Sequence, residues 1–226
     1  GLIAGAGNVA YYQSLAAGGK AAAVVSVTAL YPLVTILLAV VVLHERMRAP
    51  QWIGIALSLV ALAVFNVTTT DDLLSPWLTI ALLPIALWGL SALLHKTATT
   101  HASGEHVAFA FLLGFVPLAV VIPLFTPFQW RLEPGTWALL LTTGFLFAAG
   151  NLTLIGAYAS GGRAAIVTPL ASLYSLVTLP LASLMLGEHL GPREFLGMAI
   201  ALAAVVALSL EPRSPTAPGP DPASPR

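Results

Sequence analysis

The sequence AGGKAA at residues 17–22 returns later in the chain as SGGRAA at residues 160–165. Around this turn, residues 7–64 align without a gap with residues 150–207. Both copies consist of long apolar segments separated by short polar ones. Two related halves built of apolar helices are typical of membrane proteins that hold a solute between the halves. The repeat therefore predicts both the fold and the place of a functional site.

The composition of the chain indicates that lipid surrounds most of its surface. Of the 226 residues, 58% are hydrophobic and 8% are charged, and the mean hydropathy is +0.92. Soluble proteins carry about 25% charged residues, so this chain has too few charges to cover itself with a water-facing surface. Its nine basic and nine acidic residues cancel and form no basic patch, which argues against nucleic acid as a partner. The absence of cysteine excludes disulfides and thiolate metal sites.

The apolar runs predict an all-α fold, a polytopic membrane helix bundle. A transmembrane helix needs about 20 apolar residues, and eight runs of suitable character occur, at residues 1–17, 21–43, 52–69, 73–94, 107–125, 136–160, 164–186 and 195–210. The first run begins without an initiator methionine or a basic flank, so we expect that further helices precede Gly1. The Pro-rich residues 212–226 are expected to form a disordered tail.

Lysine and arginine residues in the short loops predict the orientation of the bundle. A cytoplasmic C-terminus places six of them inside (Arg46, Arg48, Lys96, Arg163, Arg213 and Arg226) and three outside (Lys20, Arg131 and Arg193). The equivalent residues Lys20 and Arg163 then lie on opposite sides of the membrane, so the two copies are inverted. Inversion requires an odd number of helices per copy. The second copy has five predicted helices and the first has three, so we expect about ten helices in the intact protein. We divide the chain into a first repeat at residues 1–70, a second repeat at residues 71–211 and the tail.

Several motifs recur in the same order in both copies. The first copy holds Asn8, Tyr12, Gly18-Gly19, Pro32, Leu43-His44-Glu45 and Gly54, and the second holds Asn151, Tyr158, Gly161-Gly162, Leu186-Gly187-Glu188 and Gly197. Together they resemble the EamA repeat of the drug/metabolite transporter superfamily, and residues 73–94, followed by Lys96, are similar to the opening helix of that family's second repeat. The resemblance covers residues 1–210. It implies a ten-helix exporter of small metabolites such as amino acids, with two inverted five-helix repeats, in the bacterial inner membrane.

Two positions depart from strict repetition. His44 stands where the second copy has Gly187, and Pro32 stands where the second copy has Ser175. A proline kinks a helix because it lacks an N–H group. We therefore expect that the helix kinks differ between the two copies.

Charged side chains are missing from the middle of every predicted span, and we place all five histidines (His44, His95, His101, His106 and His189) at helix ends or in loops. Proton-driven exporters often hold a carboxylate within the membrane, so this pattern favours facilitated or exchange transport. A membrane enzyme would also need an ionisable group there, and we expect no enzymatic activity. His101, Glu105 and His106 match no standard zinc spacing. We expect neither a metal nor a cofactor.

Neutral polar and aromatic side chains remain as candidates for solute binding. We predict that the solute is contacted by Asn8, Tyr12, Tyr31, Trp88, Asn151, Tyr158, Tyr174 and Ser175. Tyr31 and Tyr174 are favoured because they occupy equivalent positions in the middle of predicted spans.

Some of these residues have an alternative structural explanation. An amide buried in hydrocarbon without a partner costs about 1–3 kcal/mol, so hydrogen bonds between helices explain Asn8 and Asn151 equally well. An interfacial position explains Trp88 equally well. Tyr12 aligns with Ile155 in the second copy, which leaves its role open.

These observations predict a membrane transporter that exports small polar metabolites by rocking its two repeats about a central cavity. A flippase for a lipid-linked headgroup is the main alternative and would be indicated by a lateral opening between helices. A membrane enzyme and a non-transporting scaffold are further alternatives. The expected partners are a small-molecule solute and the lipid bilayer, and a second copy of the chain is a candidate for a homodimer.

Overall fold

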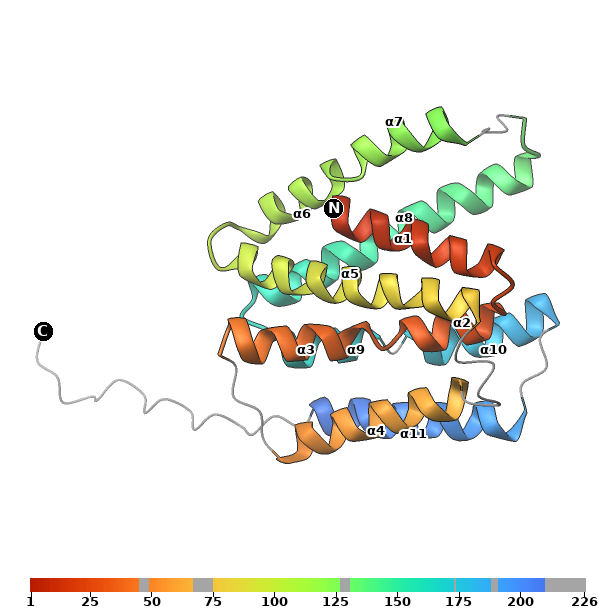
Figure 1. Cartoon of the computed structure of the whole chain (residues 1–226). Coiled ribbons are helices and arrows are strands. Elements are labelled where there is room, and N and C mark those ends of the chain that lie inside the picture. Colours follow the sequence, from red (N-terminus) through yellow and green to blue (C-terminus); the bar gives the residue numbers. More distant parts are fainter. Residues whose placement is uncertain (45–48, 67–74, 127–130, 173, 188–190, 210–226) are drawn as a thin grey trace, which may run out of the picture.

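The computed structural model describes residues 1–44, 49–66, 75–126, 131–172, 174–187 and 191–209, and every regular element within these ranges is a helix (Figure 1). The helices are α1 (Leu2–Ala16), α2 (Ala21–Thr28), α3 (Tyr31–Val42), α4 (Ala49–Asn66), α5 (Pro76–Thr99), α6 (Gly104–Leu113), α7 (Val116–Phe125), α8 (Pro134–Ala159), α9 (Ala164–Ala171), α10 (Tyr174–Leu186) and α11 (Pro192–Ser209). The prediction of an all-α bundle is confirmed. The tail predicted at residues 212–226 lies outside the described residues.

Three helical segments in the described ranges are long and apolar enough to cross a membrane, namely Pro76–Thr99, Gly104–Phe125 and Pro134–Ala159. Only 17% of the most apolar window of Gly104–Phe125, and 6% of that of Pro134–Ala159, is buried inside the chain. Apolar helices with so little protein cover are compatible with lipid rather than water as their surroundings. Shorter apolar helices accompany them at Tyr31–Val42, Ala49–Ala61 and Phe195–Ala204.

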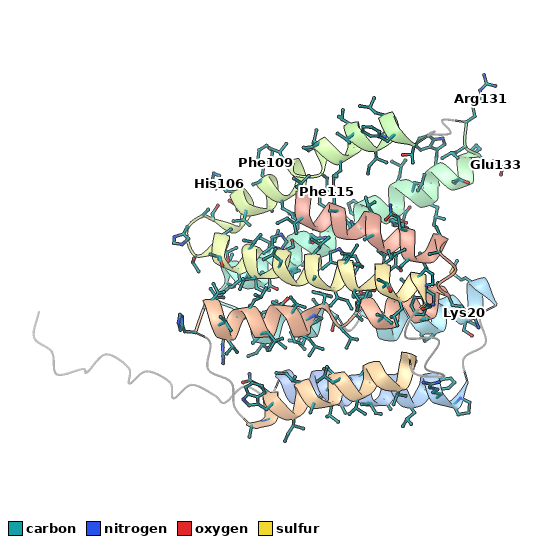
Figure 2. The ribbon with its side chains drawn as sticks, in the orientation of Figure 1. Lys20, His106, Phe109, Phe115, Arg131 and Glu133 are labelled. Carbon is teal, nitrogen blue, oxygen red and sulfur yellow. The ribbon has the colours of Figure 1, made fainter. Side chains whose placement is uncertain are left out.

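Polar side chains mark the two ends of the bundle (Figure 2). Lys20, Arg131 and Glu133 lie at one end, and His106 lies at the opposite end. We call these the Lys20 end and the His106 end. Apolar helices run between them, as expected of a protein whose helices cross a bilayer.

The two copies of the repeat run in opposite directions between these ends. In the first copy, Lys20 is the N-cap of α2, so the turn between α1 and α2 lies at the Lys20 end. In the second copy, α8 finishes at the His106 end, because a Cβ at Gly104, the first residue of α6, would lie 3.0 Å from the Cβ of Ala159. The equivalent glycines of the two turns, Gly18 at φ +97° and Gly161 at φ +93°, thus lie at opposite ends. The copies are inverted, as the loop charges predict.

The last helices of the two copies, α4 and α11, pack against each other at one edge of the bundle (Figure 1). Their contact uses small residues at equivalent positions. Gly54 and Ala61 are buried on α4, and Gly197 and Ala204 are buried on α11. A spacing of seven residues places each pair on one face of its helix, and small residues let two helix backbones approach closely.

Three predicted spans are broken near their middle in the described structure. Residues 21–43 form α2 and α3, residues 107–125 form α6 and α7, and residues 164–186 form α9 and α10. Pro32 and Pro117 occupy the first turns of α3 and α7, and a proline cannot donate to the carbonyl four residues before it. The chain crosses the bundle once in each span, but the expectation of continuous helices there is wrong.

Candidate functional site

Tyr31 and Tyr174 each begin the second half of a broken helix, α3 in the first copy and α10 in the second. The two side chains lie close enough to interact electrostatically. The helix α10 packs against α2, and the Tyr174 side chain lies close to that of Thr28, the last residue of α2. The Thr28 hydroxyl donates to the Val24 carbonyl at 2.7 Å. Polar side chains of the two repeats therefore lie close together at the breaks in both helices.

Trp88, in the middle of α5, joins Tyr31 to α1. Its indole N–H donates to Oδ1 of Asn8 at 3.0 Å and to the carbonyl of Ala4 at 3.2 Å. The indole ring lies 5.7 Å from the ring of Tyr11 and 6.0 Å, edge to face, from the ring of Tyr31. Such spacings are favourable for aromatic pairs. The structure thus brings together three of the predicted residues, Asn8, Tyr31 and Trp88.

Two glycines allow the helices to approach closely around Trp88. A Cβ at Gly89 would lie 2.9 Å from the Tyr31 carbonyl, and a Cβ at Gly7 would lie 2.6 Å from Nε1 of Trp88. Any larger residue at either position would push α5 away from its neighbours. The hydroxyl of Thr35 donates to the Gly89 carbonyl at 3.1 Å and so fixes α3 on α5. Tyr11 was not among the predicted solute contacts, although its position on α1, one turn from Asn8, would have indicated the contact.

We call Tyr11, Thr28, Tyr31, Trp88 and Tyr174 the two-repeat cluster. Its members come from α1, α2, α3, α5 and α10, and they carry hydroxyl groups, an indole N–H and aromatic faces. Tyr31 is 8% exposed, whereas Tyr174 is 40% exposed, so one side of the cluster is not covered by the described residues. The cluster is neutral, and it offers hydrogen bonds and aromatic surfaces rather than a nucleophile or an acid–base pair.

Four predicted residues are placed elsewhere or lie outside the described side chains. Tyr158 is 1% exposed and its hydroxyl lies 2.6 Å from Oγ1 of Thr168, within the second repeat. Asn151 donates from Nδ2 to the Phe147 carbonyl of its own helix at 2.9 Å. Tyr12 is 63% exposed and packs edge to face on its neighbour Tyr11. The side chain of Ser175 lies outside the described residues.

A comparison with protein-family models finds that the EamA-like transporter family matches residues 1–67 and 75–210. The chain belongs to the EamA-like transporter family. The resemblance of the repeated motifs to this family is confirmed, and the chain is an integral membrane protein of the drug/metabolite transporter type. A small-molecule solute and membrane lipid are therefore its partners. Among curated proteins, no match to the chain was found.

In this transporter, one histidine is not where the sequence analysis places it. The helix α5 continues to Thr99, past the predicted end at Leu94, and His95 is 8% exposed inside it. The placement of all five histidines at helix ends or in loops is therefore wrong for His95. The prediction from hydropathy ended the span at Leu94 because the next residues, His95 and Lys96, are polar. The spacing of seven residues between Trp88 and His95, which puts both on one helix face, would have favoured continuation of the helix.

Metal-binding groups are not found in the part of the chain that the structure describes. No set of three or more His, Asp or Glu side chains there could hold an ion. The described carboxylates are those of Glu105, in the first turn of α6, and Glu133, the N-cap of α8. Neither belongs to the two-repeat cluster.

Proposed function

We propose that the protein exports small polar metabolites, such as amino acids, and that the two-repeat cluster is its solute site. The observation that carries the proposal is that Tyr174 of the second repeat lies close to Tyr31 and Thr28 of the first, where α10 packs against α2. These residues lie where both broken helices are interrupted. A contact at this place changes when the repeats move relative to each other, and solute binding there can bias that movement.

The chemistry of the cluster suits a solute that is neutral overall. Half-helices that end within the membrane present partial charges, positive at N-termini and negative at C-termini. Here α3 and α10 begin near the tyrosines, while α2 and α9 end there. Partial charges of both signs, together with hydroxyl groups and aromatic faces, match a zwitterion better than a cation or an anion.

Two apolar layers separate the cluster from the two ends and would open in turn. At the Lys20 end, Val27 packs against Leu78 and Ala81. At the His106 end, the layer consists of Ala4, Val107, Ala108, Phe111 and Ile155; we call it the His106-end layer. In the proposed cycle, residues 1–70 and 71–211 act as the rocking repeats and the His106 end faces the cytoplasm, as the loop charges predict. The proposal involves no catalytic step.

The test is substrate counterflow in liposomes, with labelled amino acids, nucleobases and sugars. The protein is expressed with whatever natural sequence flanks this chain. Tyr31→Phe and Tyr174→Phe are each expected to slow uptake by about fivefold or more, because each removes a hydroxyl group whose hydrogen bond to the solute would be worth about 1 kcal/mol. Trp52→Phe is the control, since Trp52 is 53% exposed on α4, away from the cluster.

The outcomes separate the candidate functions. Accumulation of one class of solute that is lost in both tyrosine variants supports the proposal. Equal uptake by the variants and the parent at matched protein levels would rule out the cluster as the site. No uptake of any solute by folded protein, combined with movement of a labelled lipid between leaflets, would favour the flippase.

A further inference from the structure

His95 is a buried imidazole that the proposed solute site does not use. It is 8% exposed, and neither of its ring nitrogens has a hydrogen-bond partner among the described residues. Its ring instead meets the edge of Phe111 on α6, with centroids 4.7 Å apart and planes at 84°. Most buried polar side-chain atoms in proteins have a partner. An imidazole without a hydrogen-bond partner is therefore a candidate for a group that binds a proton from solution when the packing around it opens.

The position of His95 connects the solute site to one end of the bundle. It lies on the same face of α5 as Trp88, two turns or about 10 Å further toward the His106 end. Its partner Phe111 belongs to the His106-end layer, and so does Ala108, one turn before Phe111 on α6. A solute that moves between the two-repeat cluster and the His106 end has to separate this layer and would expose His95.

The charges near His95 would oppose a proton on its ring while the layer is closed. The neighbouring Lys96 is a cation, and its Nζ donates to the Tyr158 carbonyl at 3.5 Å. Among the described residues, the titratable and charged side chains on or next to the helices packed against this end of α5 are Tyr31, His44, Lys96, Glu105, His106, Tyr158 and Arg163. The carboxylate among them, that of Glu105, is exposed in the first turn of α6.

We infer that His95 is a proton-binding site whose occupancy is coupled to opening of the His106-end layer. A neutral ring fits the closed packing against Phe111. An imidazolium there would have no acceptor among the described residues, and burying an unpaired charge is costly. Protonation therefore favours the conformation in which α6 moves away and water reaches the ring. The proton comes from solution at the His106 end and returns to it when the layer closes.

The coupling of this proton to solute movement rests on the proposed function, whereas proton binding itself does not. The first experiment therefore needs no solute. The sequence contains no cysteine, so a single cysteine in place of Ala108, which is 4% exposed, reports opening of the layer. Ala102→Cys, in the exposed turn before α6, corrects for the pH dependence of the thiol itself.

The measured quantity is the labelling rate at position 108 divided by that at position 102, using a maleimide in liposomes. Between pH 7.5 and 5.5, where histidine ordinarily gains its proton, the ratio is expected to rise by about fivefold or more. In the His95→Gln background the ratio is expected to stay constant. A flat ratio with His95 present, or the same rise in His95→Gln, would overturn the inference. If His95→Gln does not fold, the labelling ratio of the chain with His95 is compared with that of the packing variant His95→Phe. A rise at low pH that is absent in His95→Phe supports the inference, and the same rise in His95→Phe would overturn it.

A second experiment measures counterflow against pH. The matched control is His106→Gln, because His106 is exposed at the same end and its ring is bonded to Ser103 at 2.7 Å. We expect the pH profile of the parent to be kept in His106→Gln and lost in His95→Gln. A pH-dependent labelling ratio without any counterflow would refute the proposed function and leave His95 as a proton site. Counterflow with a labelling ratio that does not change with pH would support the proposed function and refute His95 as a proton site.

Discussion

Replacing Gly7 by alanine tests the contact that holds Trp88 against α1. A Cβ at Gly7 would lie 2.6 Å from Nε1 and 2.7 Å from Cδ1 of Trp88. The indole cannot simply turn away, because its N–H is bonded to Asn8 and to the Ala4 carbonyl. We expect overpacking to cost about 1–3 kcal/mol of the free energy of unfolding. Loss of the hydrogen bond adds about 1 kcal/mol.

The equivalent residue of the second repeat, Gly150, supplies the matched control. A Cβ there would meet no heavy atom within 4 Å. Both glycines lie inside helices, where alanine is favoured over glycine by about 1 kcal/mol, so this gain is common to both variants. The difference between Gly7→Ala and Gly150→Ala therefore isolates the contact with Trp88. Gly7→Ala is expected to be about 2–4 kcal/mol less stable than Gly150→Ala.

The assay is thermal unfolding in detergent, followed by circular dichroism. For a chain of this size, 1 kcal/mol corresponds to about 2–4 °C in Tm. The double variant Gly7→Ala with Trp88→Phe is expected to recover only part of the overpacking loss, since phenylalanine lacks the Nε1 atom but keeps a ring carbon at the Cδ1 position that the new methyl group would also meet. Equal Tm values for Gly7→Ala and Gly150→Ala would refute the described approach of α1 to α5.

Three further predictions concern the two-repeat cluster and one helix end. A double-mutant cycle of Tyr174→Phe and Thr28→Val is expected to show a coupling of about 1 kcal/mol in unfolding free energy; additive effects would mean that the two hydroxyl groups do not interact. Trp88→Phe is expected to reduce counterflow by about tenfold, because it removes both the indole hydrogen bonds and ring area, whereas Trp52→Phe should leave it within about twofold; equal rates would remove Trp88 from the site. Gly161→Ala is expected to lower stability by about 1–2 kcal/mol, because its φ of +93° disfavours a Cβ although nothing lies within 4 Å; a raised Tm would contradict the left-handed turn.

Apolar length and internal repetition were enough to predict the fold. The apolar runs and the alignment of AGGKAA with SGGRAA predicted an all-α membrane bundle with inverted copies, because both features follow from transfer to lipid and from loop charge. The helix breaks could not be predicted in the same way. Pro32 and Pro117 indicate two of them, but the second copy has Ser175 at the position of Pro32.

The candidate site was predicted in part. The equivalence of Tyr31 and Tyr174 selects two members of the two-repeat cluster without knowledge of their contacts. The hydrogen bond from Trp88 to Asn8 joins residues 80 positions apart, and the register between two packed helices is not encoded in the periodicity of either one. Tyr11 was missed for the same reason. His95 was missed because its helix extends beyond the apolar run that hydropathy detects.

The pairing of α4 with α11 has a consequence for how the protein is made. The side chain of Arg193 at the start of α11 donates to the carbonyl of Val64 near the end of α4, across 129 positions of the chain. At a synthesis rate of about 5–20 residues per second, α4 leaves the ribosome on the order of ten seconds before its partner exists. During that interval its buried face of Gly54 and Ala61 meets lipid or the insertion machinery. The contact between α4 and α11 therefore forms late in synthesis. Nascent chains that stop short of α11 would expose this face of α4 to membrane chaperones and quality-control proteases.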